Sequence, residues 1–243
     1  MIRWVDGFLD RPAGSLDSAV AFWSTVTGAT PEPQRRPGYV RLRTEPPGDT
    51  WLEIQELRDG PAGTHPDLWV DDYPHFVARA RDAGAETVED HDGRLTQWSP
   101  GGLPFCVAPW RGDQRVRPGP HAGPGGVLVR PHQICLDLAP SVFDAELGFW
   151  ADLTGWEMVT GALNEFRRLQ PQHPIPIRFL IQRIGEERPA SAHLDVSCAD
   201  IPAARSWHER LGATFLGERP HWTTMRDPAG GLYCLTDGDP RTD

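Results

Sequence analysis

The sequence lacks the features that would place the protein in a membrane or outside the cell. No apolar run approaches the roughly 20 residues that a membrane-spanning helix needs. Near the N-terminus, Asp6 and Asp10 stand where a secretory signal would require an apolar core. We therefore expect a cytoplasmic protein that is neither exported nor inserted into a membrane.

Cysteine pairs and a basic surface are also missing. None of the four cysteines belongs to a Cys-x-x-Cys pair, which argues against a zinc knuckle and against a redox pair. Reduced thiols are the expected state of such cysteines in a cytoplasm. The net charge of −10 is spread along the chain. This acidic balance argues against binding to nucleic acid or to anionic membranes.

Lysine is absent, whereas glycine, proline and tryptophan are abundant, with 25, 25 and 10 residues. This composition is typical of bacterial genes of high GC content. At 243 residues the chain is long enough for one large or two ordinary domains, each with a core of its own.

One stretch of the chain occurs twice, and this repeat favours two domains. The first copy runs from His65 to Cys106 and the second from His193 to Cys234, so both residue types recur after 128 positions. Each copy contains a strand pattern that begins with histidine, a helix pattern, a strand that carries tryptophan, and a turn with proline and glycine. Self-similarity at a fixed spacing is the signature of a duplicated structural module.

Hydrophobic periodicity predicts a strand, a helix and then three strands in each quarter of the chain. Helices are expected after Ser15 or Asp17, after Asp72 or Pro74, after Ser141, and from Ile201, and each ends at a glycine. The predicted strands with clear patterns cover residues 1–10, 39–44, 51–57, 65–70, 86–89, 95–98, 103–107, 132–138, 165–169 and 177–184, and the second copy repeats the later ones. The stretch EPPGD at residues 45–49 is expected to form a turn.

Residues 111–130 are rich in proline and glycine and have no periodicity. Such a composition is typical of a linker. The predicted domains are therefore residues 1–110 and 131–243, joined by this linker.

Several motifs resemble those of the vicinal oxygen chelate superfamily, which includes glyoxalase I, bleomycin-resistance proteins and extradiol dioxygenases. The matching segments are AFWSTVTGA and GFWADLTGWE, HPDLWVDD and HLDVSCAD, and SPGGLPFCV and DPAGGLYCL. The resemblance implies an α+β fold of two tandem glyoxalase-like domains. Each domain would pair two βαβββ modules in a curved mixed sheet, with helices on the convex side and a pocket on the concave side.

Side chains alternate between the two faces of a strand, so their parity predicts which residues face the pocket. Aromatic side chains with a few polar groups suit a small organic ligand that contains an aromatic ring. Two of the tryptophans, Trp98 and Trp222, fit core packing and ligand stacking equally well. The predicted ligand-contacting residues are Trp51, Gln55, Asp67, Trp69, Trp98, Arg178, Gln182, Asp195 and Trp222.

The resemblance also implies a metal site, because related enzymes take ligands from the first, fourth, fifth and eighth strands of a domain. The matching positions are Asp6, Glu53 (or Gln55), His65 and Cys106 in the first half and Gln133, Gln182, His193 and Cys234 in the second. Of these, the predicted metal ligands are Asp6, His65, Cys106, Gln133, His193 and Cys234. Cysteine stands where the family usually has glutamate, and thiolate favours zinc over iron, manganese or nickel. This departure argues against extradiol dioxygenase chemistry and against ordinary glyoxalase I activity.

Simpler roles remain open for the same residues. Each histidine can hydrogen-bond the aspartate two positions later, and a buried cysteine often serves only as a small apolar side chain. The two halves also differ in the polar residues that they offer. We expect one of the two pockets to be the working one, and the sequence leaves open which.

Three functions fit these observations. The first is a glyoxalase-like protein that binds a small organic molecule and either sequesters or transforms it. The second is a divalent-metal-dependent lyase or isomerase in which Glu53 acts as general base. The third is a non-catalytic scaffold whose sheet edges pair with a partner or with a second copy, so both a monomer and a homodimer are compatible.

Overall fold

The structure is a computed structural model that describes residues 1–34, 36–44, 48–91, 93–112, 116–161 and 163–242. The four α-helices of this part are α1 (Leu16–Thr27), α2 (Tyr73–Asp82), α3 (Phe143–Thr154) and α4 (Ile201–Arg210). The strands of the first half are β1 (Ile2–Pro12), β2 (Thr30–Pro33), β3 (Tyr39–Arg43), β4 (Leu52–Leu57), β5 (Gly63–Val70), β6 (Glu86–His91), β7 (Arg94–Trp98) and β8 (Pro104–Pro109). Those of the second half are β9 (His121–Ala122), β10 (Leu128–Leu138), β11 (Glu157–Thr160), β12 (Phe166–Gln170), β13 (Arg178–Arg183), β14 (Ser191–Cys198), β15 (Thr214–Arg219), β16 (Trp222–Arg226) and β17 (Leu232–Asp237).

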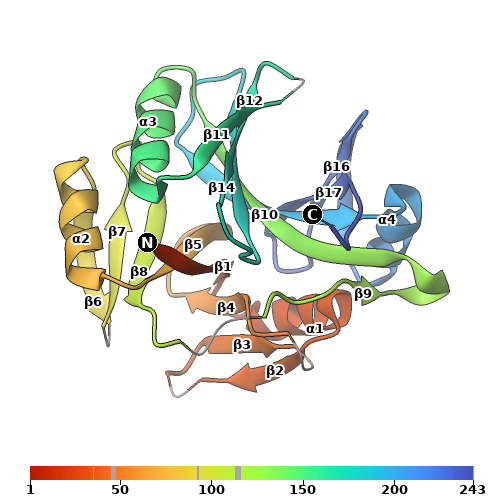
Figure 1. Cartoon of the computed structure of the whole chain (residues 1–243). Coiled ribbons are helices and arrows are strands. Elements are labelled where there is room, and N and C mark those ends of the chain that lie inside the picture. Colours follow the sequence, from red (N-terminus) through yellow and green to blue (C-terminus); the bar gives the residue numbers. More distant parts are fainter. Residues whose placement is uncertain (35, 45–47, 92, 113–115, 162, 243) are drawn as a thin grey trace. The chain divides into compact units, whose positions relative to one another are not determined.

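These strands form two mixed sheets, as the α+β prediction requires. The first sheet has the order β2-β3-β4-β1-β5-β8-β7-β6 (Figure 1). The second has the order β11-β12-β13-β10-β14-β17-β16-β15, and β9 pairs with β10 outside this path. Each sheet therefore contains two βαβββ modules from one half of the chain, which confirms the predicted module plan. No helix of the described residues is both long and apolar enough to cross a membrane.

Hydrophobic periodicity did not predict strands β2 and β11. All four residues of β2 are exposed, as are three of the four in β11, so neither strand has the buried alternating face that predicts a strand. The predicted linker also contains regular structure, because β9, a short 3-10 helix at Pro124–Gly126 and the start of β10 fall within it. Residues 113–115 of the linker and 45–47 of the expected EPPGD turn lie outside the described residues.

The chain forms two compact units, and each unit combines one module from each half. Unit 1 comprises Met1–Asp6, His65–Arg115 and Ile134–Ala192. Unit 2 comprises Gly7–Thr64, Val116–Gln133 and His193–Asp243. The helices therefore pair as α2 with α3 in unit 1 and as α1 with α4 in unit 2.

The helix ends follow the expected capping chemistry in most places. Asp72 and Asp200 each accept a hydrogen bond from the backbone N–H three residues later, which satisfies an otherwise unpaired donor. Helices α1 and α3 end at Gly28 and Gly155, both in the left-handed conformation that glycine adopts without strain. The predicted cap at Ser141 is wrong, because Val142 is the residue that directly precedes α3. The Ser141 hydroxyl hydrogen-bonds the Glu187 carboxylate instead.

In unit 1, aromatic side chains pack α3 against the sheet. The Trp150 ring lies 5.2 Å from the rings of Phe105 and Phe149 and 5.4 Å from that of Phe179, all in edge-to-face geometry. Arg79 of α2 donates to the backbone carbonyls of Asp152 and Leu153 at the end of α3. A cation at this helix end stabilises the exposed carbonyls and fixes the α2–α3 pair.

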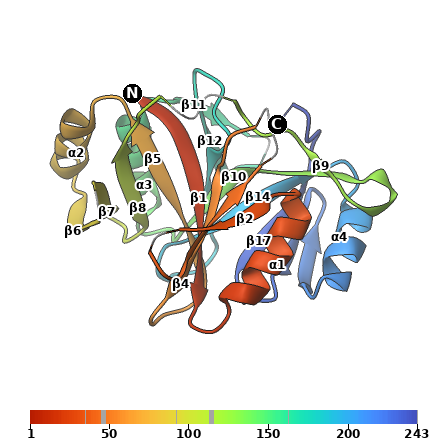
Figure 2. The ribbon, with the colours of Figure 1, turned by 90° about the horizontal axis from the view of Figure 1, so that it is seen from below.

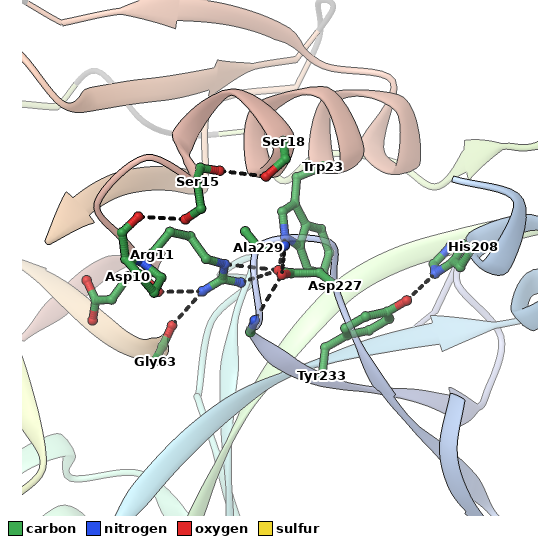
Figure 3. A network of polar contacts seen from close by, with 12 residues as sticks. Asp10, Arg11, Ser15, Ser18, Trp23, Gly63, His208, Asp227, Ala229 and Tyr233 are labelled. Carbon is green, nitrogen blue, oxygen red and sulfur yellow. Dashed lines mark hydrogen bonds and ion pairs between the residues drawn. The ribbon is translucent and has the colours of Figure 1, made fainter. Parts of the chain in front are cut away.

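Unit 2 has an equivalent aromatic cluster, formed by side chains of α1, α4 and β17. Figure 2 shows both helices near this strand. The Phe22 ring lies 5.5 Å from the His208 imidazole, and the Trp23 ring lies 5.2 Å from that of Tyr233. The His208 Nδ1 lies 3.0 Å from the Tyr233 hydroxyl oxygen (Figure 3). His208 is fully buried, so its imidazole belongs to the core of this unit.

Acid is expected to destabilise the protein through His208. Burial lowers the pKa of His208 from its usual 6.5 to about 4. Protonation therefore favours the unfolded chain, and stability that is complete above pH 6.5 is lost as the pH falls toward 4. The loss should reach about 3 kcal/mol at the lower limit. Urea unfolding of the wild type and of His208→Gln between pH 7.5 and 4.5 measures it: the difference between the two should shrink as the pH falls, and parallel curves would contradict the assignment.

A buried carboxylate holds the turn that precedes the last strand in unit 2. Asp227 Oδ1 accepts the backbone N–H groups of Ala229 and Gly231. Its Oδ2 accepts from the Arg11 guanidinium at 2.6 Å and from the Trp23 indole N–H at 2.9 Å (Figure 3). One side chain thereby fixes the turn, the first strand and the first helix.

Unit 1 builds the same junction with a different residue. Ser99 stands at the position equivalent to Asp227, and the carboxylate comes from Glu146 of α3. Glu146 accepts hydrogen bonds from the Ser99 hydroxyl at 2.8 Å, from the Trp150 indole at 3.0 Å and from the Gly101 backbone N–H. In both units, therefore, the helix tryptophan and the turn share one buried carboxylate.

Candidate functional site

Strand register brings three polar side chains into a row in the first half of the chain. Parallel pairing of β5 and β8 sets Asp67 opposite Cys106. Antiparallel pairing of β7 and β8 sets Thr96 opposite the same cysteine. His65 lies two residues before Asp67 on the same strand, so both side chains project from one face.

The second half repeats this row in the same register. Asp195 of β14 lies opposite Cys234 of β17, and Thr224 of β16 lies opposite the cysteine on its other side. His193 again lies two residues before the aspartate. The conserved spacing of 128 positions thus corresponds to an identical arrangement of strands and side chains.

The first cluster consists of His65, Asp67 and Cys106 and lies within unit 1. The His65 Nε2 is 3.4 Å from the nearer Asp67 oxygen and 3.8 Å from the Cys106 sulfur. All three residues are buried. Burial, with the nearby Asp67 charge, raises the pKa of the Cys106 thiol. The cysteine is therefore a protonated thiol at neutral pH in the absence of a bound cation.

Two further side chains complete the first cluster. The Thr96 hydroxyl lies 3.4 Å from the Cys106 sulfur. The Arg94 Nε lies 3.0 Å from the second Asp67 oxygen, and its guanidinium carbon lies 5.4 Å from the centre of the Trp69 ring. The carboxylate of this cluster is therefore ion-paired with a guanidinium.

The second cluster consists of His193, Asp195 and Cys234 and lies within unit 2. The His193 Nε2 is 3.3 Å from the nearer Asp195 oxygen and 3.4 Å from the Cys234 sulfur. The Thr224 hydroxyl lies 3.7 Å from that sulfur. The second Asp195 oxygen accepts a 2.7 Å hydrogen bond from the Gln133 amide. This carboxylate is thus held by a neutral amide where the first cluster has an arginine.

The geometry of both clusters differs from that of a nucleophilic triad. A triad uses one imidazole nitrogen for the nucleophile and the other for the carboxylate. Here the sulfur and the carboxylate oxygen both approach the same nitrogen, Nε2. One potential ligand atom from each residue lies within 4.8 Å of the others in each cluster. Imidazole, carboxylate and thiolate converging on one point form a donor set that fits zinc.

The remaining predicted metal ligand, Asp6, is engaged by two indoles. Its carboxylate accepts from Trp4 Nε1 at 3.0 Å and from Trp69 Nε1 at 2.7 Å. Asp6 is buried within unit 1. Its counterpart Gln133 contacts the second cluster directly, so the two predicted first-strand ligands have different surroundings.

Several predicted pocket residues make contacts inside unit 2. Glu53 is buried, and its carboxylate lies 3.3 Å from an Arg41 nitrogen. The Gln55 amide donates to Asp10. Trp51 is buried, and its indole donates to the Pro131 carbonyl at 3.3 Å. Ligand contact by Trp51 or Gln55 and base catalysis by Glu53 stay predictions.

The other predicted ligand-contacting residues lie in varied surroundings. Trp98 is exposed, whereas Trp222 and Arg178 are half-buried. The Gln182 carbonyl oxygen lies 3.7 Å from the Cys135 sulfur. Their contact with a ligand stays a prediction.

Sequence reasoning missed three residues of the clusters, namely Arg94, Thr96 and Thr224. The two threonines recur after 128 positions, so the repeat carried a signal for them. Arg94 instead breaks the repeat, because its counterpart is Trp222. Its contact with Asp67 depends on the strand register and could not be predicted from local patterns.

A family model described as a glyoxalase-like domain matches residues 8–108 and 133–236. No curated protein sequence matches the chain. Among solved structures, the Mn(II)-bound glyoxalase from Novosphingobium aromaticivorans is 15% identical, with a TM-score of 0.65 over 97% of this chain and 81% of that one.

Two dioxygenases are similar to the same extent. The 2,2',3-trihydroxybiphenyl 1,2-dioxygenase from Sphingomonas wittichii strain RW1 is 15% identical, with a TM-score of 0.63 over 98% of this chain and 91% of that one. An extradiol ring-cleaving dioxygenase from B.fuscum is 13% identical, with a TM-score of 0.66 over 98% and 72% of the respective chains. At these identities, the similarity shows a shared fold and nothing beyond it.

Proposed function

The chain belongs to the glyoxalase-like domain family, and with it to the vicinal oxygen chelate superfamily, and from this premise we propose that it is a zinc-dependent lyase or isomerase. Its substrate class would be small organic molecules with oxygen atoms on neighbouring carbons. The metal would be held by a His-Asp-Cys cluster.

The observation that carries this proposal is the convergence of three donors on one point, in two copies. A buried carboxylate beside a buried thiol is costly unless a cation compensates the charge. An ion between these side chains would provide that compensation and would remove the thiol proton on binding. Aromatic or aliphatic side chains would fill the same positions at lower cost if the cluster had no such role.

The cysteine distinguishes this chain from its structural neighbours. Thiolate is a soft ligand that favours zinc, whereas manganese favours oxygen donors. The neighbour from Novosphingobium aromaticivorans contains Mn(II). We therefore propose that this chain binds zinc and that iron, manganese and nickel bind the same site more weakly.

The protein's own residues would orient the ligands and the substrate. Gln133 hydrogen-bonds the Asp195 carboxylate, and Thr224 hydrogen-bonds the Cys234 sulfur. Both would thereby hold a metal-ligating side chain in position. When bound, zinc would polarise an oxygen of the substrate. Glu53, buried and paired with Arg41, is the proposed group for moving a proton on the substrate carbon.

Metal analysis tests this proposal. Protein stripped with a chelator and dialysed against zinc should retain about one ion per chain, as structural and catalytic zinc sites do. Either His65→Ala or His193→Ala should lose it, whereas His221→Ala, which removes an exposed imidazole, should not. The zinc-loaded protein should convert an α-hydroxy or α-oxo carbonyl compound and the stripped protein should not. Zinc retention by both His65→Ala and His193→Ala, or full turnover by the stripped protein, would overturn the proposal.

A further inference from the structure

We propose that Arg94 takes the place of a metal ion in the first cluster, so that only the second cluster binds metal. This inference rests on the proposed function, because it assigns the metal of that function to one of two similar sites. It also names the residue that prevents metal binding at the other site.

The contacts of Arg94 carry the first step. Its Nε lies 3.0 Å from the Asp67 Oδ2, and the Asp67 side chain is only 1% exposed. A guanidinium at this distance provides the positive charge that a buried carboxylate requires. A divalent ion entering the cluster would meet this fixed charge, and like charges repel strongly at short range inside a protein.

The second cluster lacks this compensation. Asp195 receives its 2.7 Å hydrogen bond from the Gln133 amide, which carries no charge. In the part of the chain that the structure describes, no arginine forms an ion pair with Asp195. The same three donors are therefore present without a built-in cation, so a divalent ion would supply the charge that Arg94 supplies in unit 1.

The two positions that decide this difference are equivalent. Leu95 pairs with Val107 and Thr223 pairs with Leu235, each in the same antiparallel register and 128 positions apart. Arg94 and Trp222 each immediately precede the first residue of these pairs. Exchanging the residue types at these two positions should therefore exchange the metal preference of the clusters.

Reciprocal variants test the inference by zinc stoichiometry and by titration calorimetry. The wild type should bind about one zinc ion, and Arg94→Gln should bind about two, with the new site at least ten times tighter than any first-cluster binding in the wild type. Arg94→Lys keeps the charge and should still bind one. Trp222→Arg should lose the wild-type site. Circular dichroism and thermal unfolding of each stripped variant check that the fold is kept.

The outcomes separate this inference from the proposed function. Two ions in the wild type would overturn the role of Arg94 and leave a metal-dependent function intact. The same holds for a single ion in both the wild type and Arg94→Gln. A wild-type ion that is lost in His65→Ala and kept in His193→Ala would overturn the assignment to the second cluster. No zinc in any of these proteins would overturn the proposed function and the inference together.

Discussion

Replacing Asp227 with asparagine is expected to lower the free energy of unfolding by roughly 3–5 kcal/mol, which is the typical cost of breaking a buried ion pair. The Arg11 and Asp227 side chains are both 0% exposed, with 2.6 Å between the Arg11 Nη2 and the Asp227 Oδ2. Asparagine would leave the guanidinium buried without its counter-charge. The single carbonyl oxygen of asparagine can accept hydrogen bonds from the backbone of the turn or from Arg11 and Trp23, but not from both sets of donors.

The matched control for this prediction is Glu146→Gln in unit 1. Glu146 accepts from a hydroxyl, an indole and a backbone N–H, and no arginine of the described residues forms an ion pair with it. Removing its charge leaves no buried cation behind, so the loss should be about 1–3 kcal/mol. Urea unfolding followed by tryptophan fluorescence measures both variants. Equal losses in the two would show that the Arg11 charge does not set the cost.

Replacing Cys234 with glutamate is expected to change the metal preference from zinc toward manganese. A glutamate supplies the oxygen donor that the vicinal oxygen chelate family usually has on the eighth strand, and oxygen donors suit manganese better than sulfur does. The affinity for zinc should fall by at least tenfold, and the ratio of manganese to zinc affinity should rise by more. Competitive titration of the stripped protein with the two metals measures this ratio.

The control for the cysteine exchange is Cys198→Ala. Cys198 is also a buried thiol of unit 2, and burial raises its pKa, but its sulfur contacts only a backbone carbonyl among its described hydrogen bonds. Its removal should leave both metal affinities unchanged. An equal effect of Cys198→Ala and Cys234→Glu would indicate a general loss of packing in place of a lost ligand.

The repeat made most of the fold predictable from the sequence. The repeat spacing of 128 positions can be read from the sequence directly, as can the strands that begin with histidine and the glycines after the helices. Together they specify the modules. The exposed strands β2 and β11 gave no such signal, because nothing on them is buried. The pairing of α1 with α4 and of α2 with α3 depends on packing between distant modules, which no local pattern reports.

The candidate site was predictable in part for the same reason. His65 and Cys106, and their counterparts, stand at motif positions, so the sequence indicated them as possible partners. The contact of Arg94 with Asp67 requires the register of three strands and the direction of a long side chain. The role of Glu146 was equally hidden, since a glutamate within a helix usually faces solvent, whereas this one holds a turn of the sheet.

We expect the second cluster to hold a divalent ion and the first cluster to hold none. Anomalous X-ray diffraction at the zinc absorption edge, from crystals of stripped protein reloaded with zinc, tests it most directly. We predict one strong peak within coordination distance of the His193 Nε2, the Asp195 carboxylate and the Cys234 sulfur, and none between His65 and Cys106. A reloaded crystal with no peak at the second cluster, or with its strongest peak at the first, would contradict the claim.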